Sequence, residues 1–173
     1  MNFLRKLATL PFLVIICSKL NAQIQVDYMS MKGFSAIGFG TFLNFAFPVN
    51  ESDYGTIEGG FDAFSKDDNY VINAPCILGY RYTLDRTGEG FYVEPNLGYA
   101  FGDSDVQVSD QNGFYSNAKI AGFSGGATFG YLFPQSGIIQ FNVGLRYEHI
   151  FGPVGTNLLS LRISHAFTFG RRE

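Results

Sequence analysis

The two histidines of this chain are the residues best suited to acid–base chemistry. A histidine that activates a serine nucleophile needs that serine and an orienting acid close by. His149 is followed by Ile150 and Phe151 rather than by a serine, and His165, beside Ser164, shares its place in the local alternation with apolar residues. We therefore expect both histidines to be interfacial or surface residues, and we predict no catalytic residue.

Spaced aspartates are a second candidate chemistry, because Ca²⁺ prefers carboxylate and other oxygen ligands. They lie in the long polar stretch 102–118 and in a shorter turn: Asp103, Asp105, Asp110, Asp67 and Asp68. A calcium loop has denser, fixed spacing and a closing glutamate, and the closing glutamate is missing here. The sequence predicts solvated acidic loops, with no metal and no cofactor.

Seven other charged residues are defined by their position in alternating segments. Every second residue of these segments is apolar, and the charged residues all occupy the other set of positions: Glu58, Asp62, Arg81, Glu94, Arg146, Glu148 and Arg162. A charge that faces lipid at the middle of a bilayer costs about 2–4 kcal/mol, so a membrane strand turns such residues inward. We predict that these side chains meet in an ion-pair network that plugs the lumen of a closed sheet.

The elements that would position these charges are β-strands with two unlike faces. In segment 91–101 the odd positions hold Phe, Val, Pro, Leu, Tyr and Phe, and the even positions hold Tyr, Glu, Asn, Gly and Ala. A period of two indicates a strand, and about ten residues are enough for a tilted strand to cross a bilayer. The alternation predicts eight strands, at 24–32 (the weakest), 35–47, 55–65, 70–82, 91–101, 119–133, 138–150 and 158–169.

These strands predict an all-β fold, an eight-stranded antiparallel up-and-down transmembrane β-barrel. Unpaired strand edges cannot face hydrocarbon, so the sheet must close, and the small residues of the polar face suit a narrow interior. The alternative, a secreted soluble β-domain, would carry more charge than the 16% found here.

The even number of strands predicts the orientation of the barrel. It places both chain ends and turn 134–137 in the periplasm, and stretch 102–118 outside the cell. Aromatic residues near the strand ends should form two interfacial girdles, Phe47, Phe91, Phe133, Phe167 and Phe169 on the inner side and Tyr99, Phe101, Tyr147 and Phe151 on the outer side.

The N-terminus predicts export. Arg5 and Lys6 precede the apolar run 7–17, which indicates a secretory signal peptide over residues 1–22, cleaved between Ala22 and Gln23. A lipoprotein signal acylated at Cys17 is the alternative. Residues 23–173 would then form one outer-membrane β-barrel domain.

The predicted mature chain is acidic and has one cysteine. Nine basic residues face fifteen acidic ones, a net charge of −6, which argues against a nucleic-acid partner. Cys76 is the one cysteine left, so no internal disulfide is possible. Its place on the apolar face predicts that it acts as a small hydrophobic residue.

Segment 90–99 (GFYVEPNLGY) and the aromatic-ended last strand carry a family resemblance. Over residues 24–170 the chain resembles the small outer-membrane β-barrel proteins of the OmpA-barrel, OmpX and Ail type. The resemblance implies residence in the cell outer membrane among its lipids. It also implies insertion by the barrel-assembly machinery through a terminal signal that Phe167-Thr168-Phe169 matches, although four residues follow it.

We therefore predict a monomeric, non-enzymatic barrel with a structural or surface-interaction role in adhesion or in the cell envelope. A host or cell-surface ligand would be contacted through loop 102–118. Two alternatives stay open, a lipid A-modifying outer-membrane enzyme and a small channel. A water-filled channel conflicts with the plugged lumen predicted above.

Overall fold

The computed structural model describes residues 19–86, 88–109, 115–134 and 139–168, in which every regular element is a β-strand. The strands are β1 (Lys19–Met31), β2 (Phe34–Pro48), β3 (Asp53–Lys66), β4 (Asn69–Thr83), β5 (Gly90–Ser104), β6 (Gln107–Ser109), β7 (Tyr115–Asn117), β8 (Ile120–Leu132), β9 (Ile139–Phe151) and β10 (Thr156–Thr168). Among the described residues, no helix has the length and hydropathy needed to cross a membrane.

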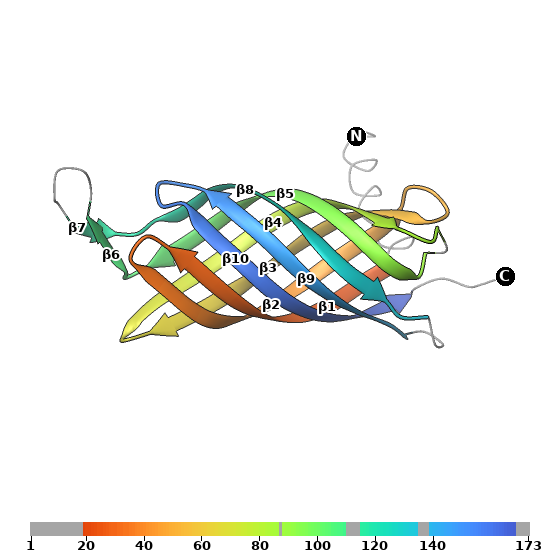
Figure 1. Cartoon of the computed structure of the whole chain (residues 1–173), viewed down its shortest axis with the longest axis horizontal. Coiled ribbons are helices and arrows are strands. Elements are labelled where there is room, and N and C mark those ends of the chain that lie inside the picture. The colour runs from red at the N-terminus through yellow and green to blue at the C-terminus, as the bar shows by residue number, and fades with distance from the viewer. Residues whose placement is uncertain (1–18, 87, 110–114, 135–138, 169–173) are drawn as a thin grey trace, which may run out of the picture.

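Eight strands form a closed antiparallel barrel in the order β1-β10-β9-β8-β5-β4-β3-β2 (Figure 1). Strand β1 closes it by pairing with β10 on one side and β2 on the other, for example Ile24 with Ile163 and with Thr41. The predicted eight-stranded barrel is confirmed, including its weakest strand. Strand β1 begins at Lys19, so cleavage after Ala22 would leave Gln23–Met31 as the first strand.

The two faces of the barrel carry opposite kinds of side chain. The outer face is apolar and exposed, as at Leu97 (73% exposed) and Phe123 (73%), and Cys76 lies on it as predicted. The inner face is buried, and it holds all seven charged residues that the alternation singled out. The period-two pattern therefore places apolar side chains on the outer face and charged side chains in the lumen, as a membrane barrel requires.

The lumen has an apolar layer that the sequence analysis did not predict. Thirteen buried apolar residues form one cluster toward the end that carries the β1–β2 and β9–β10 turns. This apolar layer consists of Met29, Met31, Phe34, Ala36, Phe64, Val71, Ala100, Val106, Ala118, Ile120, Ile150, Val154 and Leu158. Several of them sit at inner-face positions of strands that elsewhere point polar residues inward.

Glycines on the inner face make room for lumenal aromatic rings. A Cβ at Gly130 would lie 2.5 Å from the ring of Tyr92, and a Cβ at Gly60 would lie 2.6 Å from the ring of Phe42. Real Cβ atoms do not approach other heavy atoms so closely, so glycine is needed where one of these rings packs against the neighbouring strand.

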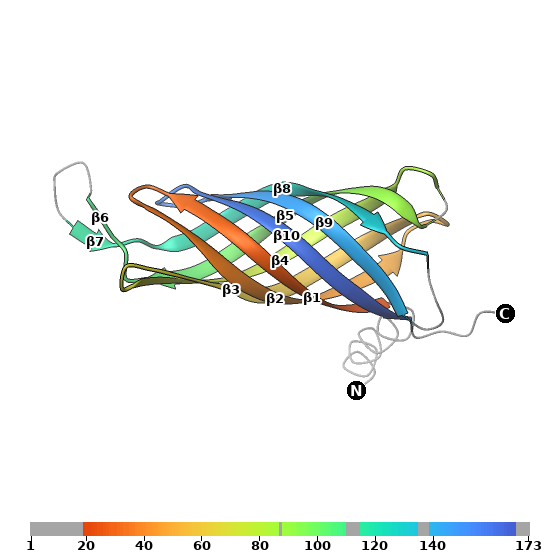
Figure 2. The same ribbon diagram turned by 60° about the horizontal axis from the view of Figure 1, so that its bottom comes forward.

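The two ends of the barrel differ in their connections. At the end opposite the start of β1, which we call the outer end, residues 32–33, 67–68 and 152–155 form short turns. The positive φ angles of Asp67 (50°) and Asp68 (65°) suit a two-residue hairpin turn. The β5–β8 connection is long, and within it β6 and β7 pair as a small hairpin that projects beyond the rim (Figures 1 and 2).

Stretch 102–118 meets β8 at the outer end of the barrel, opposite the end where β8 finishes at Leu132; residues 135–137 of the predicted turn 134–137 lie outside the described part. The predicted contrast between long outer loops and short inner turns holds for this one connection. At the outer end two connections have two residues each, whereas the β4–β5 connection at the other end spans residues 84–89.

Aromatic contacts mark both ends of the outer face. Near one end Phe91 stacks on Phe129 (5.7 Å between ring centroids) and meets Tyr131 edge-on (5.0 Å). Near the outer end Tyr99 packs against Phe101 (4.8 Å) and Phe123 (5.5 Å). Phe91, Tyr99 and Phe101 lie on the girdles predicted for them; Phe169 lies outside the described residues, and the side chain of Phe167 is not described.

Candidate functional site: the lumen and the outer rim

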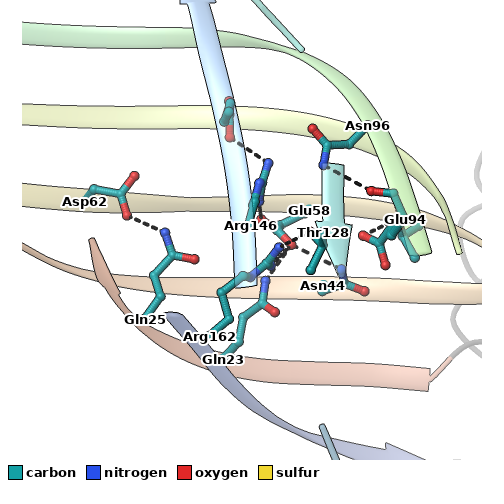
Figure 3. Close-up of polar contacts among 12 residues, drawn as sticks. Gln23, Gln25, Asn44, Glu58, Asp62, Glu94, Asn96, Thr128, Arg146 and Arg162 are labelled. Atoms are coloured by element: carbon teal, nitrogen blue, oxygen red, sulfur yellow. Dashed lines mark hydrogen bonds and ion pairs between the residues drawn. The ribbon is translucent and has the colours of Figure 1, made fainter. Parts of the chain in front are cut away.

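Glu58 of β3 is the centre of the buried charges. Arg146 of β9 donates through Nη1 to Glu58 Oε1 at 2.5 Å, and Arg162 of β10 donates through Nη2 to Glu58 Oε2. Figure 3 shows the two guanidinium groups converging on this one carboxylate from the far side of the lumen. The amides of Gln23 (2.5 Å) and Asn44 (3.2 Å) also donate to Glu58 Oε2.

Two further ion pairs adjoin this centre. Arg146 Nη2 lies 2.7 Å from Glu148 Oε2, and Arg81 Nε lies 2.6 Å from Glu94 Oε2. The guanidinium of Arg81 also lies over the ring of Tyr92, 4.7 Å from its centroid, a favourable cation–π arrangement. We call the six residues Glu58, Glu94, Glu148, Arg81, Arg146 and Arg162 the ionic layer.

Asp62, the seventh predicted residue, forms no ion pair with an arginine of the described residues. Its carboxylate accepts hydrogen bonds from Gln25 (2.9 Å) and Asn73 (3.2 Å), and Gln25 also donates to Asp27 at 2.8 Å. In Figure 3 the Gln25–Asp62 contact is separate from the group around Glu58. Asp27 and Asp62, which we call the acid pair, therefore form a second polar group with a different composition.

Sequence reasoning missed several partners of these charges. Gln23, Gln25 and Asp27 lie on the inner face of β1, the strand whose alternation is weakest. Their spacing of two, against Ile24, Val26 and Tyr28, was the signal that could have found them.

A hollow of about 530 Å³ lies at the outer rim between the β6–β7 hairpin and the neighbouring turns. We call it the rim hollow; it is lined by Lys32, Val108, Ser109, Ser116, Asn117, Lys119, Pro153, Val154 and Gly155. Lys32 Nζ donates to the Ser109 carbonyl at 3.3 Å, and both lysines are exposed. The predicted loop 102–118 thus supplies one wall of a basic, partly polar depression.

The base of the hairpin is anchored in the barrel. The Ala118 amide donates to the Val106 carbonyl (2.7 Å), and the Ser104 hydroxyl donates to the Ala118 carbonyl (2.7 Å). Val106 and Ala118 both belong to the apolar layer. The hairpin therefore leaves the barrel from two fixed points rather than from a free loop.

The other candidate residues have structural contacts. His149 Nδ1 lies 2.9 Å from Asn157 Oδ1, and its ring packs on Phe151 (4.5 Å between centroids). His165 lies beside Phe141, with 6.4 Å between centroids. Asp105 accepts a hydrogen bond from the Tyr70 backbone amide at 2.6 Å. Asp110 lies outside the described residues.

Comparisons with known proteins identify the fold. No protein-family model matches the chain, and no curated protein matches its sequence. Among solved structures, Neisserial surface protein A (NspA) superposes with a TM-score of 0.66 at 16% identity, covering 88% of this chain and 97% of NspA. Ail, the attachment invasion locus protein of Yersinia pestis, gives 0.61 at 14% identity, covering 87% and 97%. The N-terminal barrel of Pseudomonas aeruginosa OprF gives 0.52 at 11% identity, covering 87% and 99%.

At these identities the likeness concerns architecture, and it spans nearly the whole of each neighbour. The chain has the fold of the small eight-stranded outer-membrane β-barrels, as the sequence resemblance predicted.

Proposed function

We propose that this chain is a non-enzymatic protein of the bacterial outer membrane, with a closed lumen and a role at the cell surface. The support for the membrane is the apolar outer face, because soluble monomers seldom expose large contiguous apolar surfaces. Export through a signal peptide at residues 1–22 and insertion by the barrel-assembly machinery belong to the same proposal.

The two layers of the lumen support closure. Arg146 and Arg162 cross it to reach Glu58, and the apolar layer fills the space toward the outer end. The barrel purified into planar bilayers should give no steady conductance. A steady open current would overturn closure and favour the small channel.

The contacts of the histidines support a non-catalytic role. His149 touches an amide oxygen and an aromatic ring, neither of which is a nucleophile, and His165 lies among the apolar side chains of the outer face. Mass spectrometry of lipid A from cells with and without the protein should give the same profile. A lost or added acyl chain would establish the lipid A-modifying enzyme instead.

The rim hollow is the observation that carries the surface role. It pairs two exposed lysines with serine and asparagine side chains, a composition suited to an anionic saccharide. A structural neighbour, Ail, has been solved with the heparin analogue sucrose octasulfate, at a TM-score of 0.59 and 14% identity. We infer that the ligand class of this surface is a sulfated or phosphorylated glycan.

Charge reversal at the hollow tests this role. Cells displaying the wild-type barrel should bind immobilised heparin, and the double variant Lys32→Glu, Lys119→Glu should bind at least tenfold less. Lys66→Glu is the matched control, because Lys66 lies at the outer end of β3 but does not line the hollow. Equal binding by all three proteins would exclude the rim hollow as the site.

A second variant tests the hairpin as a whole. Gln107–Asn117 should be replaced by a short Gly-Ser linker, with Val106 and Ala118 retained because they belong to the apolar layer. We expect a folded barrel that no longer binds. Retained binding would place the surface role elsewhere on the barrel.

A further inference from the structure

The acid pair is the buried acidic group of the described lumen that forms no ion pair with an arginine. Five lumenal carboxylates, on Asp27, Glu58, Asp62, Glu94 and Glu148, face three arginines. A sixth buried acid, Asp53, lies at the turn end of β3, where Asn50 and Tyr80 bind it. Within the described ranges the lumenal ion pairs join arginine only to glutamate. Asp27 and Asp62 therefore form no ion pair with an arginine.

The geometry holds these two carboxyl groups together. The nitrogen of the Gln25 amide lies 2.8 Å from Asp27 Oδ1 and 2.9 Å from Asp62 Oδ1. Both aspartates are 1% exposed, and the Ser160 hydroxyl lies within hydrogen-bonding reach of Asp27. Two ionised carboxylates this close and this buried repel each other strongly, so the pair must either share a proton or bind a positive charge.

The surrounding side chains offer more acceptors than donors. Asp27 Oδ2, Gln25 Oε1 and Asn73 Oδ1 are buried and have no hydrogen-bond partner. Gln25 and Asn73 already touch the acid pair through their amide nitrogens, so a half-turn of either amide directs its oxygen at the carboxylates. Buried acceptors are normally satisfied, so these three oxygen atoms are candidates to bind an electropositive partner.

We propose that the acid pair, with the side-chain oxygens of Gln25 and Asn73, is a lumenal binding site for a divalent cation of the Ca²⁺ type. Two carboxylates match its charge, and a mixed set of carboxylate and amide oxygens suits the flexible coordination of Ca²⁺ better than the strict octahedron of Mg²⁺. The described residues hold no cluster of three or more His, Cys, Asp or Glu side chains, so the amides complete the donor set.

The place of the site predicts how the ion enters. Asp27 and Asp62 are each followed two residues later, on the same inner face, by Met29 and Phe64 of the apolar layer, and Asn73 is preceded two residues earlier by Val71 of that layer. The site thus lies directly beneath that layer, with the ionic layer on its other side. The cation would be captured as the barrel closes, and it would exchange slowly afterwards.

Metal content and thermal stability of the whole barrel test the proposal, independently of the surface role. The protein is refolded into detergent with CaCl₂, MgCl₂, NaCl or a chelator and is then dialysed. We expect one Ca²⁺ per chain by elemental analysis. At about 100-fold saturation we expect a melting temperature about 5–10 °C higher with Ca²⁺ than with chelator.

Isosteric variants identify the ligands. Asp27→Asn and Asp62→Asn should each abolish the bound Ca²⁺ and the calcium-dependent shift. Asp103→Asn should keep both, because Asp103 is an exposed acid near the outer end of β5 and controls for surface binding. The metal content of the wild-type protein decides the question even if one variant does not fold.

Two outcomes would overturn the proposal. The first is a wild-type barrel that holds no stoichiometric calcium and has the same melting temperature in every salt and in chelator. The second is bound calcium and a calcium-dependent shift that Asp27→Asn and Asp62→Asn both keep. The first result would mean that the acid pair shares a proton instead of holding a metal ion, and the second that calcium binds elsewhere on the barrel.

Discussion

The two layers of the lumen occupy one narrow space with different chemistry. The apolar layer uses side chains such as Phe64, Ile120 and Ile150, which pack without directional bonds. The ionic layer uses Glu58, which joins β3 to Arg146 and Arg162, 88 and 104 residues away in the chain. Apolar packing tolerates small shifts between strands, whereas a forked guanidinium on one carboxylate does not. We therefore assign the register across the lumen to the ionic layer and the proposed closure at the outer end to the apolar layer.

The first prediction breaks the ionic layer at its centre. Glu58→Gln should lower the free energy of unfolding by about 3–5 kcal/mol, because two buried guanidinium groups lose their shared carboxylate. The chain has no tryptophan, so circular dichroism with the heat-dependent gel shift is the appropriate measurement. Glu148→Gln is the control and should cost about 1–3 kcal/mol, since Arg146 keeps Glu58. Equal losses would remove Glu58 from the centre of the layer.

The second prediction tests the apolar layer in the same assay. Ile120 is fully buried, and Ile120→Ala should cost about 2–5 kcal/mol through lost contacts and a cavity. Ile120→Met keeps the volume and should cost less than about 1.5 kcal/mol. If both variants matched the wild type, this layer would not contribute to stability.

The third prediction asks whether charge is tolerated only on the inner face. Leu145→Arg places a cation on the outer face, where Leu145 is 51% exposed, and should cost about 2–4 kcal/mol and impair insertion. Asn142→Asp, on the inner face of the same strand, should be milder, because the Tyr92 hydroxyl lies 3.5 Å from Asn142 Oδ1 and can donate to a carboxylate there. Equal heat-modifiability of the two variants would contradict the assignment of faces.

The fourth prediction uses two glycines of β8. Gly130→Ala should cost about 1–3 kcal/mol, since its Cβ would lie 2.5 Å from Tyr92. Gly125→Ala should be neutral or stabilising by up to about 1 kcal/mol, because its Cβ would meet Leu97 at an ordinary 3.5 Å. Melting temperatures compare the two directly, and a loss at Gly125 as large as at Gly130 would mean that ring space is not the reason for the glycine.

The alternation of side chains was enough to predict the barrel and which side chains point inward. It worked because successive residues of a strand point to opposite faces, so the parity of a position decides that Leu145 lies on the outer face and Arg146 in the lumen. It did not predict the apolar layer, because residues such as Ile120 and Met29 interrupt the polar set and look like irregularities in the pattern.

The partners within the lumen could not be predicted from the sequence. Whether Arg162 reaches Glu58 or Asp62 depends on the stagger of β10 against β3 across the barrel, and side-chain periodicity does not encode this stagger. The β6–β7 hairpin was expected to be loop because its strands have three residues each, too few to show a period.

The shortness of three turns at the outer end limits which parts of the barrel other molecules can contact there. In the proposed orientation, the longest connection that antibodies and bacteriophages would meet at this end of the barrel is the segment between Val106 and Ala118. Immune and phage pressure should therefore fall on that segment, and sequences from related strains should diverge there first while the two anchoring residues and the barrel beneath them stay the same.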